Sequence, residues 1–72
     1  MIKLEVRVYI RNVAGPHKFV LEHDEAGSQG YIHSGDVVYE KFKNGVFVPL
    51  SDGTNIYYPH HTINCIEYNK VK

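Results

Sequence analysis

Residues 57–68, YYPHHTINCIEY, bring together the side chains of this sequence that are best suited to chemistry. The stretch holds two of the chain's five histidines and its only cysteine, on the C-terminal side of Pro59. Imidazole and thiolate groups are common zinc ligands, and a thiolate beside a histidine base can act as a nucleophile. His60, His61 and Cys65 are therefore the first candidates for a metal site or a catalytic site.

A zinc site would need further ligands from elsewhere in the chain. Structural zinc usually takes four Cys or His ligands in closely spaced pairs, and the sequence has no CxxC or HxxxH pair. His17, His23 or His33 would have to complete the set, and the adjacent His60 and His61 would point to opposite faces of a strand. We interpret the histidines as surface residues and expect no metal and no cofactor.

Catalysis by cysteine or by carboxylates receives no better support. Cys65 is predicted on a strand, without the base and orienting group that would activate a thiolate, and we interpret it as a small core residue. The side chains of residues 22–25 (Glu22, His23, Asp24 and Glu25) could exchange protons, but they begin a polar turn with no pocket implied. We therefore expect no catalytic residues and a protein that is not an enzyme.

Composition limits the possible partners and compartments. The 72 residues predict one domain over residues 1–72, and eight basic residues balance eight acidic ones, so no bulk charge favours nucleic acid or an anionic membrane. No run approaches the roughly 18 apolar residues of a membrane span, and the N-terminus lacks a signal-peptide pattern. A single cysteine cannot form an internal disulfide, which favours the cytoplasm.

Side-chain types and periodicity predict an all-β chain. Ile, Val, Thr, Tyr and Phe are abundant, whereas Ala, Leu and Met are scarce. The clearest signal lies in residues 2–10, where aliphatic and mostly polar or charged residues alternate and place the aliphatic ones on one face of a strand. That face consists of Ile2, Leu4, Val6, Val8 and Ile10.

The rest of the chain predicts further strands joined by turns. Residues 17–34 contain the glycine-rich DEAGSQG and are expected to form a long hairpin with a mobile tip. Residues 36–42 are expected to be extended, and Asn44–Gly45 and Asp52–Gly53 predict tight turns. A three-stranded antiparallel meander would result, with its middle strand bulged or unpaired near Pro49.

Pro59 predicts a corner between the last two strands. Its fixed φ suits the start of a single 3₁₀ turn near residues 59–62. Tyr58, Ile63 and Ile66 are expected to point into the core, and Tyr57 to point outward.

The segment YPHHTI resembles the closing corner of Src-homology-three domains, in which proline, a 3₁₀ turn and a core aliphatic follow one another with the spacing of Pro59 and Ile63. The resemblance implies a small antiparallel β-barrel of five to six strands, with Sm-like and chromatin-reader barrels as alternatives of similar topology. It implies a fold and not a function. The chain has no tryptophan, and Thr62 stands where the peptide-binding members usually have a tyrosine, so proline-rich peptides are not the expected ligands.

Two binding functions follow from this interpretation. Small barrels that bind single-stranded nucleic acid stack bases on aromatic side chains, and Tyr9 between Arg7 and Arg11 would be the platform on the first strand. This is the alternative function, because the face also carries Glu5 and the chain is neutral.

A protein partner, which could be a second copy of the chain, is the favoured function. Exposed tyrosines are typical interface anchors. The candidate contact residues come from the hairpin predicted over residues 17–34 and from the corner at Pro59, which would be neighbours in a barrel: Tyr31, His33, Tyr57, His60 and His61. We expect a self-associating accessory subunit or a small inhibitor, of the kind that phages encode, with no membrane partner.

Overall fold

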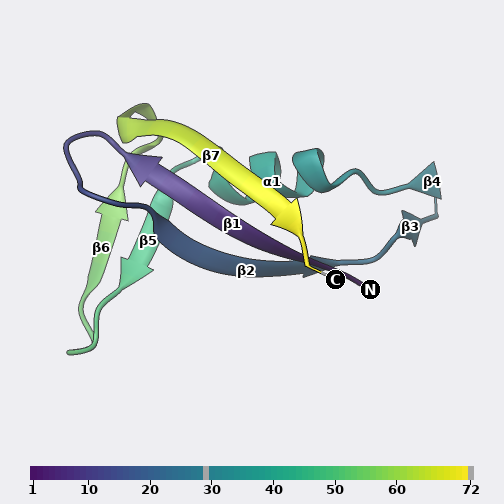
Figure 1. Cartoon of the computed structure of the whole chain (residues 1–72), viewed down its shortest axis with the longest axis horizontal. Coiled ribbons are helices and arrows are strands. Elements are labelled where there is room, and N and C mark those ends of the chain that lie inside the picture. The colour runs from purple at the N-terminus through teal and green to yellow at the C-terminus, as the bar shows by residue number, and fades with distance from the viewer. Residues whose placement is uncertain (29, 72) are drawn as a thin grey trace.

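A three-stranded antiparallel sheet forms the centre of the computed structural model, which describes residues 1–28 and 30–71. β1 (Ile2–Ile10) is the middle strand, β2 (His17–His23) pairs along one side of it, and β7 (Ile63–Lys70) pairs along the other (Figure 1). The prediction of a first strand over residues 2–10 is confirmed.

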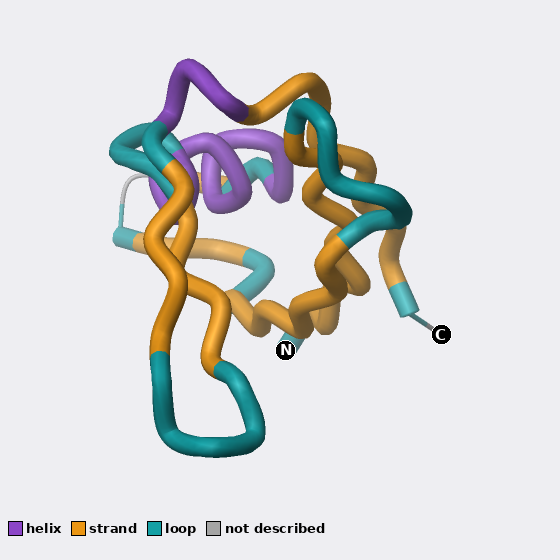
Figure 2. The backbone as a smooth tube through the Cα atoms, turned by 90° about the vertical axis from the view of Figure 1, so that its left-hand side faces the viewer, coloured by secondary structure: helices purple, strands orange, loops and turns teal. Residues whose placement is uncertain are grey.

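The aliphatic face of β1 forms the core, as its alternating pattern predicts. The buried residues of this strand are Leu4, Val6, Val8 and Ile10. The helix α1 (Ser34–Phe42) covers this face with Val38 and Phe42, and Figure 2 shows the helix on the concave side of the strands. The ring of Phe42 contacts Phe19 of β2, with 5.3 Å between the ring centroids. Removal of this apolar surface from water stabilises the fold by about 25 cal/mol per Å².

The helix shows that the prediction of an extended strand over residues 36–42 is wrong. Val38 and Phe42 are four residues apart and therefore share one face of a helix, whereas Glu40 is exposed and lies 2.7 Å from Lys43 in an ion pair. Adjacent valines favour a strand locally, but packing of an amphipathic face against a sheet outweighs such a preference. No helix within residues 1–28 and 30–71 is long and apolar enough to cross a membrane.

Residues 17–34 do not form the single long hairpin that the sequence predicts. β2 pairs with β1 along its whole length, and only a short hairpin of β3 (Ala26–Gly27) and β4 (Gly30–Tyr31) follows it. The predicted mobile tip includes residue 29, which lies outside the described residues.

A two-stranded ribbon follows the helix. β5 (Val46–Pro49) and β6 (Asn55–Tyr58) pair antiparallel around the loop that contains Asp52 and Gly53, so the hairpin predicted there is confirmed. Pro49 pairs with Asn55 without a register shift, so the prediction of a bulged or unpaired strand near Pro49 is wrong. Figures 1 and 2 both show the ribbon projecting from the rest of the molecule. In Figure 1, β6 is its outer strand and β5 lies between β6 and the body.

The structure confirms the 3₁₀ turn predicted near residues 59–62, at the corner after the ribbon. The 3₁₀ helix η1 (His60–Thr62) follows Pro59, whose carbonyl oxygen accepts hydrogen bonds from the Thr62 N–H at 3.0 Å and from the Thr62 hydroxyl at 2.7 Å. Tyr58, Ile63 and Ile66 pack against the core, which confirms their inward direction.

Cys65 is exposed, so its prediction as a core residue is wrong. The register between β1 and β7 shifts where Tyr9 faces Cys65 and Ile10 faces Ile63, which leaves Asn64 as the extra residue of a β-bulge. Because the bulge adds one residue to β7, Ile63 and Cys65 face opposite sides of the sheet, although they are two residues apart in the sequence. Ile63 therefore points inward and Cys65 lies on the outer face beside Tyr9.

The chain is a small β-rich fold, but the predicted closed all-β barrel is not found. The described residues form three separate sheets, β2–β1–β7, β3–β4 and β5–β6, and none of them closes on itself. Residues 1–28 and 30–71 contain seven strands, two of them only two residues long, in place of the five to six expected, and they also form a helix. The helix covers the side that further strands would cover in a barrel.

Candidate functional site

The predicted contact residues lie at two ends of the molecule, and not on one surface. Tyr31 and His33 lie in and just after β4, at one end of the 38 Å long axis, whereas Tyr57, His60 and His61 belong to β6 and η1 near the other end (Figure 1). The expectation that residues 17–34 and the corner at Pro59 are neighbours depended on a closed barrel. The two groups are therefore separate candidates.

Tyr57 is held in place by the backbone around Gly45. Its hydroxyl donates a hydrogen bond of 2.7 Å to the carbonyl oxygen of Asn44, and its ring passes so close to Gly45 that a Cβ there would lie 2.8 Å from Tyr57 Cε1. Tyr57 is nevertheless 48% exposed, in agreement with the prediction that its side chain points outward. An aromatic ring that is fixed before binding loses little conformational entropy in a complex.

Phe47 completes an aromatic surface with Tyr57, and the sequence analysis missed it. The two residues are opposite each other in the β5–β6 ribbon, their ring centroids are 4.8 Å apart, and Phe47 is 65% exposed. We call these two side chains the aromatic surface. The available signal was the alternation of VFVP, which places Phe47 on the opposite face from the inward Val46.

A shallow hollow of about 160 Å³ lies beside the aromatic surface. Phe47 and Lys41 line it from the exposed side, and buried Phe42 lines it from the core. Aromatic anchors next to small hydrophobic hollows are the usual centres of protein interfaces. His60 and His61 follow the ribbon on η1 with both side chains exposed.

A larger open hollow of about 550 Å³ lies at the other end, where Tyr31 and His33 line it together with Ile2, Tyr68 and Lys70. Tyr31 is 84% exposed and no contact of its ring with another aromatic ring is found within the described residues. This hollow is wide and open to solvent.

His23, the last residue of β2, connects this strand to α1 through Ser34, which lines the hollow. Its Nδ1 is 2.8 Å from the carbonyl oxygen of Asp24 and must donate to it, so in the neutral ring Nε2 accepts a hydrogen bond of 2.9 Å from the Ser34 hydroxyl. The side chain is buried with both ring nitrogens bonded, so the interpretation of His23 as a surface residue is wrong. Its role is therefore to fix the start of the helix, and it is not free to act as a base.

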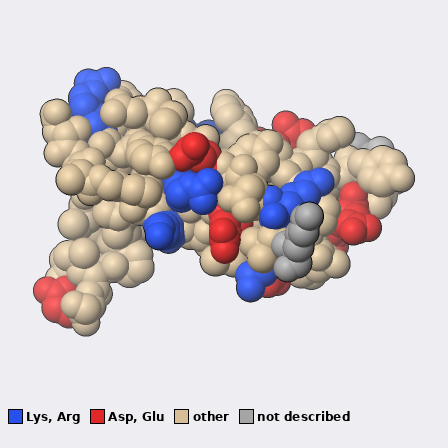
Figure 3. Space-filling model, viewed as in Figure 1, with Lys and Arg blue, Asp and Glu red and all other residues tan. Residues whose placement is uncertain are grey.

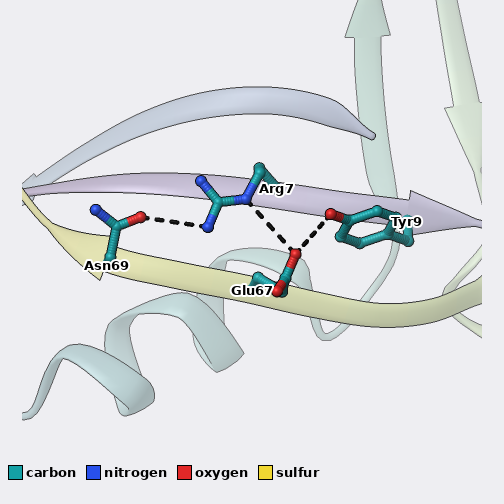
Figure 4. A network of polar contacts seen from close by, with 4 residues as sticks. All are labelled: Arg7, Tyr9, Glu67 and Asn69. Carbon is teal, nitrogen blue, oxygen red and sulfur yellow. Dashed lines mark hydrogen bonds and ion pairs between the residues drawn. The ribbon is translucent and has the colours of Figure 1, made fainter. Parts of the chain in front are cut away.

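Arg7 and Tyr9, two members of the alternative nucleic-acid platform, are engaged in contacts within the sheet. The Tyr9 hydroxyl donates a 2.6 Å hydrogen bond to Glu67, and Arg7 Nε lies 3.6 Å from the same carboxylate oxygen (Figure 4). Arg7 also donates to Asn69 at 3.4 Å. Arg11 lies apart from this network, where its side chain is 3.5 Å from the carbonyl oxygen of His61.

This network changes the acid–base behaviour of its members. The hydrogen bond to the Glu67 carboxylate raises the pKa of Tyr9, because it stabilises the protonated phenol. The same hydrogen bond, followed by the charge of Arg7, lowers the pKa of Glu67. Arg7 is therefore neutralised by a neighbour, and Figure 3 shows basic and acidic side chains mixed across this face.

Replacing Glu67 by glutamine should lower the pKa of Tyr9 toward its ordinary value, because the amide accepts a weaker hydrogen bond and carries no charge. The Tyr9 titration can be followed by NMR with tyrosine labelled at Cζ, with Glu5→Gln on the same face as the control. Glu67 has a lowered pKa in the folded state, so its contribution to stability is present above its ordinary pKa and is lost as the pH falls through the lowered value. A Tyr9 titration that is the same in wild type and Glu67→Gln would contradict this network.

No metal-binding cluster is present among residues 1–28 and 30–71, where no three His, Cys, Asp or Glu side chains come together. Cys65 lies on the outer sheet face beside Tyr9. Neither it nor the histidines of η1 are arranged as a set of ligands.

Comparisons with known proteins add no functional information. No protein-family model matches the chain, no curated protein matches it, and no solved structure matches it. Function must therefore be argued from the surfaces of this chain.

Proposed function

We propose that this chain is a non-enzymatic protein-binding module that contacts its partner through the aromatic surface of Phe47 and Tyr57. The observation that carries the proposal is an exposed pair of aromatic rings at 4.8 Å, one of which is fixed by a hydrogen bond to Asn44. Fixed aromatic side chains contribute large contact areas at low entropic cost. His60 and His61 would lie at the polar rim of the contact.

Charge supports a protein partner over a nucleic acid. Residues 44–58, which form the ribbon and its turns, contain one charged side chain, Asp52, and the whole chain has a formal charge of zero. Binding to single-stranded nucleic acid depends on a basic groove, and Arg7 is already paired with Glu67. The proposed protein-binding function includes two roles: a subunit that associates with other copies of itself, and a small inhibitor of the kind that phages encode.

We also propose the cytoplasm as the compartment. Cys65 is a single exposed thiol, and such thiols persist where the surroundings are reducing.

Phe47→Ser should remove most partner binding, whereas Tyr31→Ser should not. We expect a partner captured from the native host's lysate to bind the Phe47→Ser chain at least about tenfold more weakly, as for other aromatic interface anchors. Tyr31→Ser is the matched control, because Tyr31 is also an exposed aromatic on a strand but lies at the opposite end. Quantitative mass spectrometry of captured proteins, followed by titration of the purified partner, measures the effect.

Equal capture by wild type and Phe47→Ser would contradict the proposal. Loss of capture with Tyr31→Ser alone would move the binding site to the hollow between Tyr31 and Tyr68.

A further inference from the structure

The hydrogen-bond pattern of the β5–β6 ribbon leaves one of its two edges ready to pair with another strand. The Leu50 N–H donates to the Thr54 carbonyl oxygen at 2.7 Å, so Leu50 and Thr54 form a hydrogen-bonded pair. Such pairs alternate with pairs whose N–H and C=O groups point away from the partner strand. In the register of the ribbon, Phe47 and Tyr57 therefore form a non-hydrogen-bonded pair, and so do Pro49 and Asn55. The backbone polar groups of these four residues point away from the partner strand.

The two edges differ because of Pro49. On the β5 edge, Phe47 offers an N–H and a C=O, but Pro49 has no N–H to offer. On the β6 edge, Asn55 and Tyr57 each offer both groups, and within the described residues β6 pairs with β5 alone, so no strand occupies this edge. Figure 1 shows β6 as the outermost strand at this end of the molecule. β6 is thus the edge at which a further strand can be added.

We propose that the strand added at this edge is β6 of a second copy, in an antiparallel dimer with its two-fold axis at Ile56. This inference goes beyond the proposed function, because the second copy binds at the backbone edge of β6 and leaves the aromatic surface free for a different protein. Asn55 of each copy would exchange both backbone hydrogen bonds with Tyr57 of the other, and Ile56 would face Ile56. All outward-pointing backbone groups of β6 are then paired.

Side chains on both faces are self-complementary in this register. On the inner face, Val48 and Ile56 of one copy continue into Ile56 and Val48 of the other, which makes an unbroken aliphatic row. On the outer face, Tyr57 of one copy lies beside Asn55 of the other, so both aromatic surfaces stay exposed for another protein. A monomer leaves Ile56 only partly covered.

Electrostatics permit a second copy as the occupant. The chain has no net charge, and the ribbon residues 44–58 contain only Asp52 as a charged side chain, so no strong repulsion opposes the approach of two copies. The same register directs the Asp52 loop of one copy toward the η1 end of the other, where His60 is exposed. Figure 3 shows the projecting ribbon as uncharged except for acidic atoms at its tip.

The dimer is tested by sedimentation equilibrium over micromolar to millimolar concentrations. The wild-type chain should be in equilibrium between monomer and dimer. Asn55→Pro should raise the dissociation constant of the dimer at least about tenfold, because each copy loses one outward N–H donor, two in the dimer. The matched control is Asn55→Ala, which retains the N–H and should dimerise like wild type. Asn55→Pro leaves the ribbon's own hydrogen bonds intact, and its thermal unfolding checks that the fold persists.

Charge exchange tests the position of the two-fold axis. Ile56→Glu and Ile56→Lys should each prevent dimerisation, because like charges would face one another, and a mixture of the two chains should restore a heterodimer. Hydrogen exchange of the unmodified protein gives an independent measurement: the Asn55 and Tyr57 amides should become protected as concentration rises, whereas the Phe47 amide should not.

A chain that stays monomeric at millimolar concentration, or an Asn55→Pro chain that dimerises like wild type, would overturn the proposal. If the wild-type chain is monomeric while Phe47→Ser still loses capture of a different protein, the dimer is wrong and the proposed function stands. If dimers form but Phe47→Ser changes no capture, the aromatic surface is not the binding site for other proteins and the β6 dimer stands.

Discussion

The Phe42→Ala variant should lose about 3–5 kcal/mol of unfolding free energy, the usual cost of deleting a buried phenylalanine ring. Phe42 is 3% exposed, packs on Phe19 with 5.3 Å between the ring centroids, and joins α1 to the sheet. A 72-residue chain has roughly 4–11 kcal/mol of stability in total, so this loss is a large fraction of it. Urea unfolding followed by circular dichroism measures the effect, and the thermal midpoint should fall by on the order of 20 °C.

Tyr39→Ala is the control for Phe42→Ala. Tyr39 belongs to the same helix but is exposed, so its truncation should change stability by about 0.5 kcal/mol or less. If Phe42→Ala were no more destabilising than Tyr39→Ala, the helix would not be packed on β1 and the arrangement of the core would be wrong.

The first strand could be predicted from the sequence because its signal is local. Alternation of apolar and polar residues over residues 2–10 needs no knowledge of partners, and four of its five aliphatic residues are buried. The helix was missed although Val38 and Phe42 have helical spacing, because the segment is short and its adjacent valines favour a strand. The decisive interaction is packing of this face on β1, which is a tertiary contact.

The position of Cys65 could not be predicted, since it depends on the pairing of β7 with β1. The bulge at Asn64 exists only in that pairing, and it places Ile63 inward and Cys65 outward. The three-residue spacing of Ile63 and Ile66 was a visible sign that alternation is interrupted.

The candidate site was predictable only in part. Tyr57 was expected to point outward, because Pro59 and the inward Tyr58 fix the alternation of that strand, and this is confirmed. Grouping Tyr57 with Tyr31 required a closed barrel, and none of the three sheets in the described residues closes on itself. Phe47 is opposite Tyr57 only because of the ribbon's register, which follows from the length of the loop around Gly53.

Gly45→Ala should be the most damaging glycine substitution and should disrupt the aromatic surface directly. Gly45 has φ of 112°, and a Cβ there would lie 2.6 Å from the carbonyl oxygen of Tyr58 and 2.8 Å from Tyr57 Cε1. The strained backbone alone costs on the order of 1–3 kcal/mol, and displacement of β6 adds to it, so we expect a loss of about 3 kcal/mol or more. Urea unfolding measures this loss.

Gly53→Ala separates backbone strain from crowding, because Gly53 also has a positive φ, 89°, but a Cβ there meets no atom within 4 Å. It should cost about 1–2 kcal/mol. Only Gly45→Ala should also remove the ring-to-ring nuclear Overhauser effects between Phe47 and Tyr57, since the Tyr57 ring must leave its place against residue 45. Equal losses of stability from the two substitutions, with the ring contacts preserved in both, would mean that Gly45 does not hold Tyr57. The aromatic surface would then lack the fixed geometry on which its proposed binding role depends.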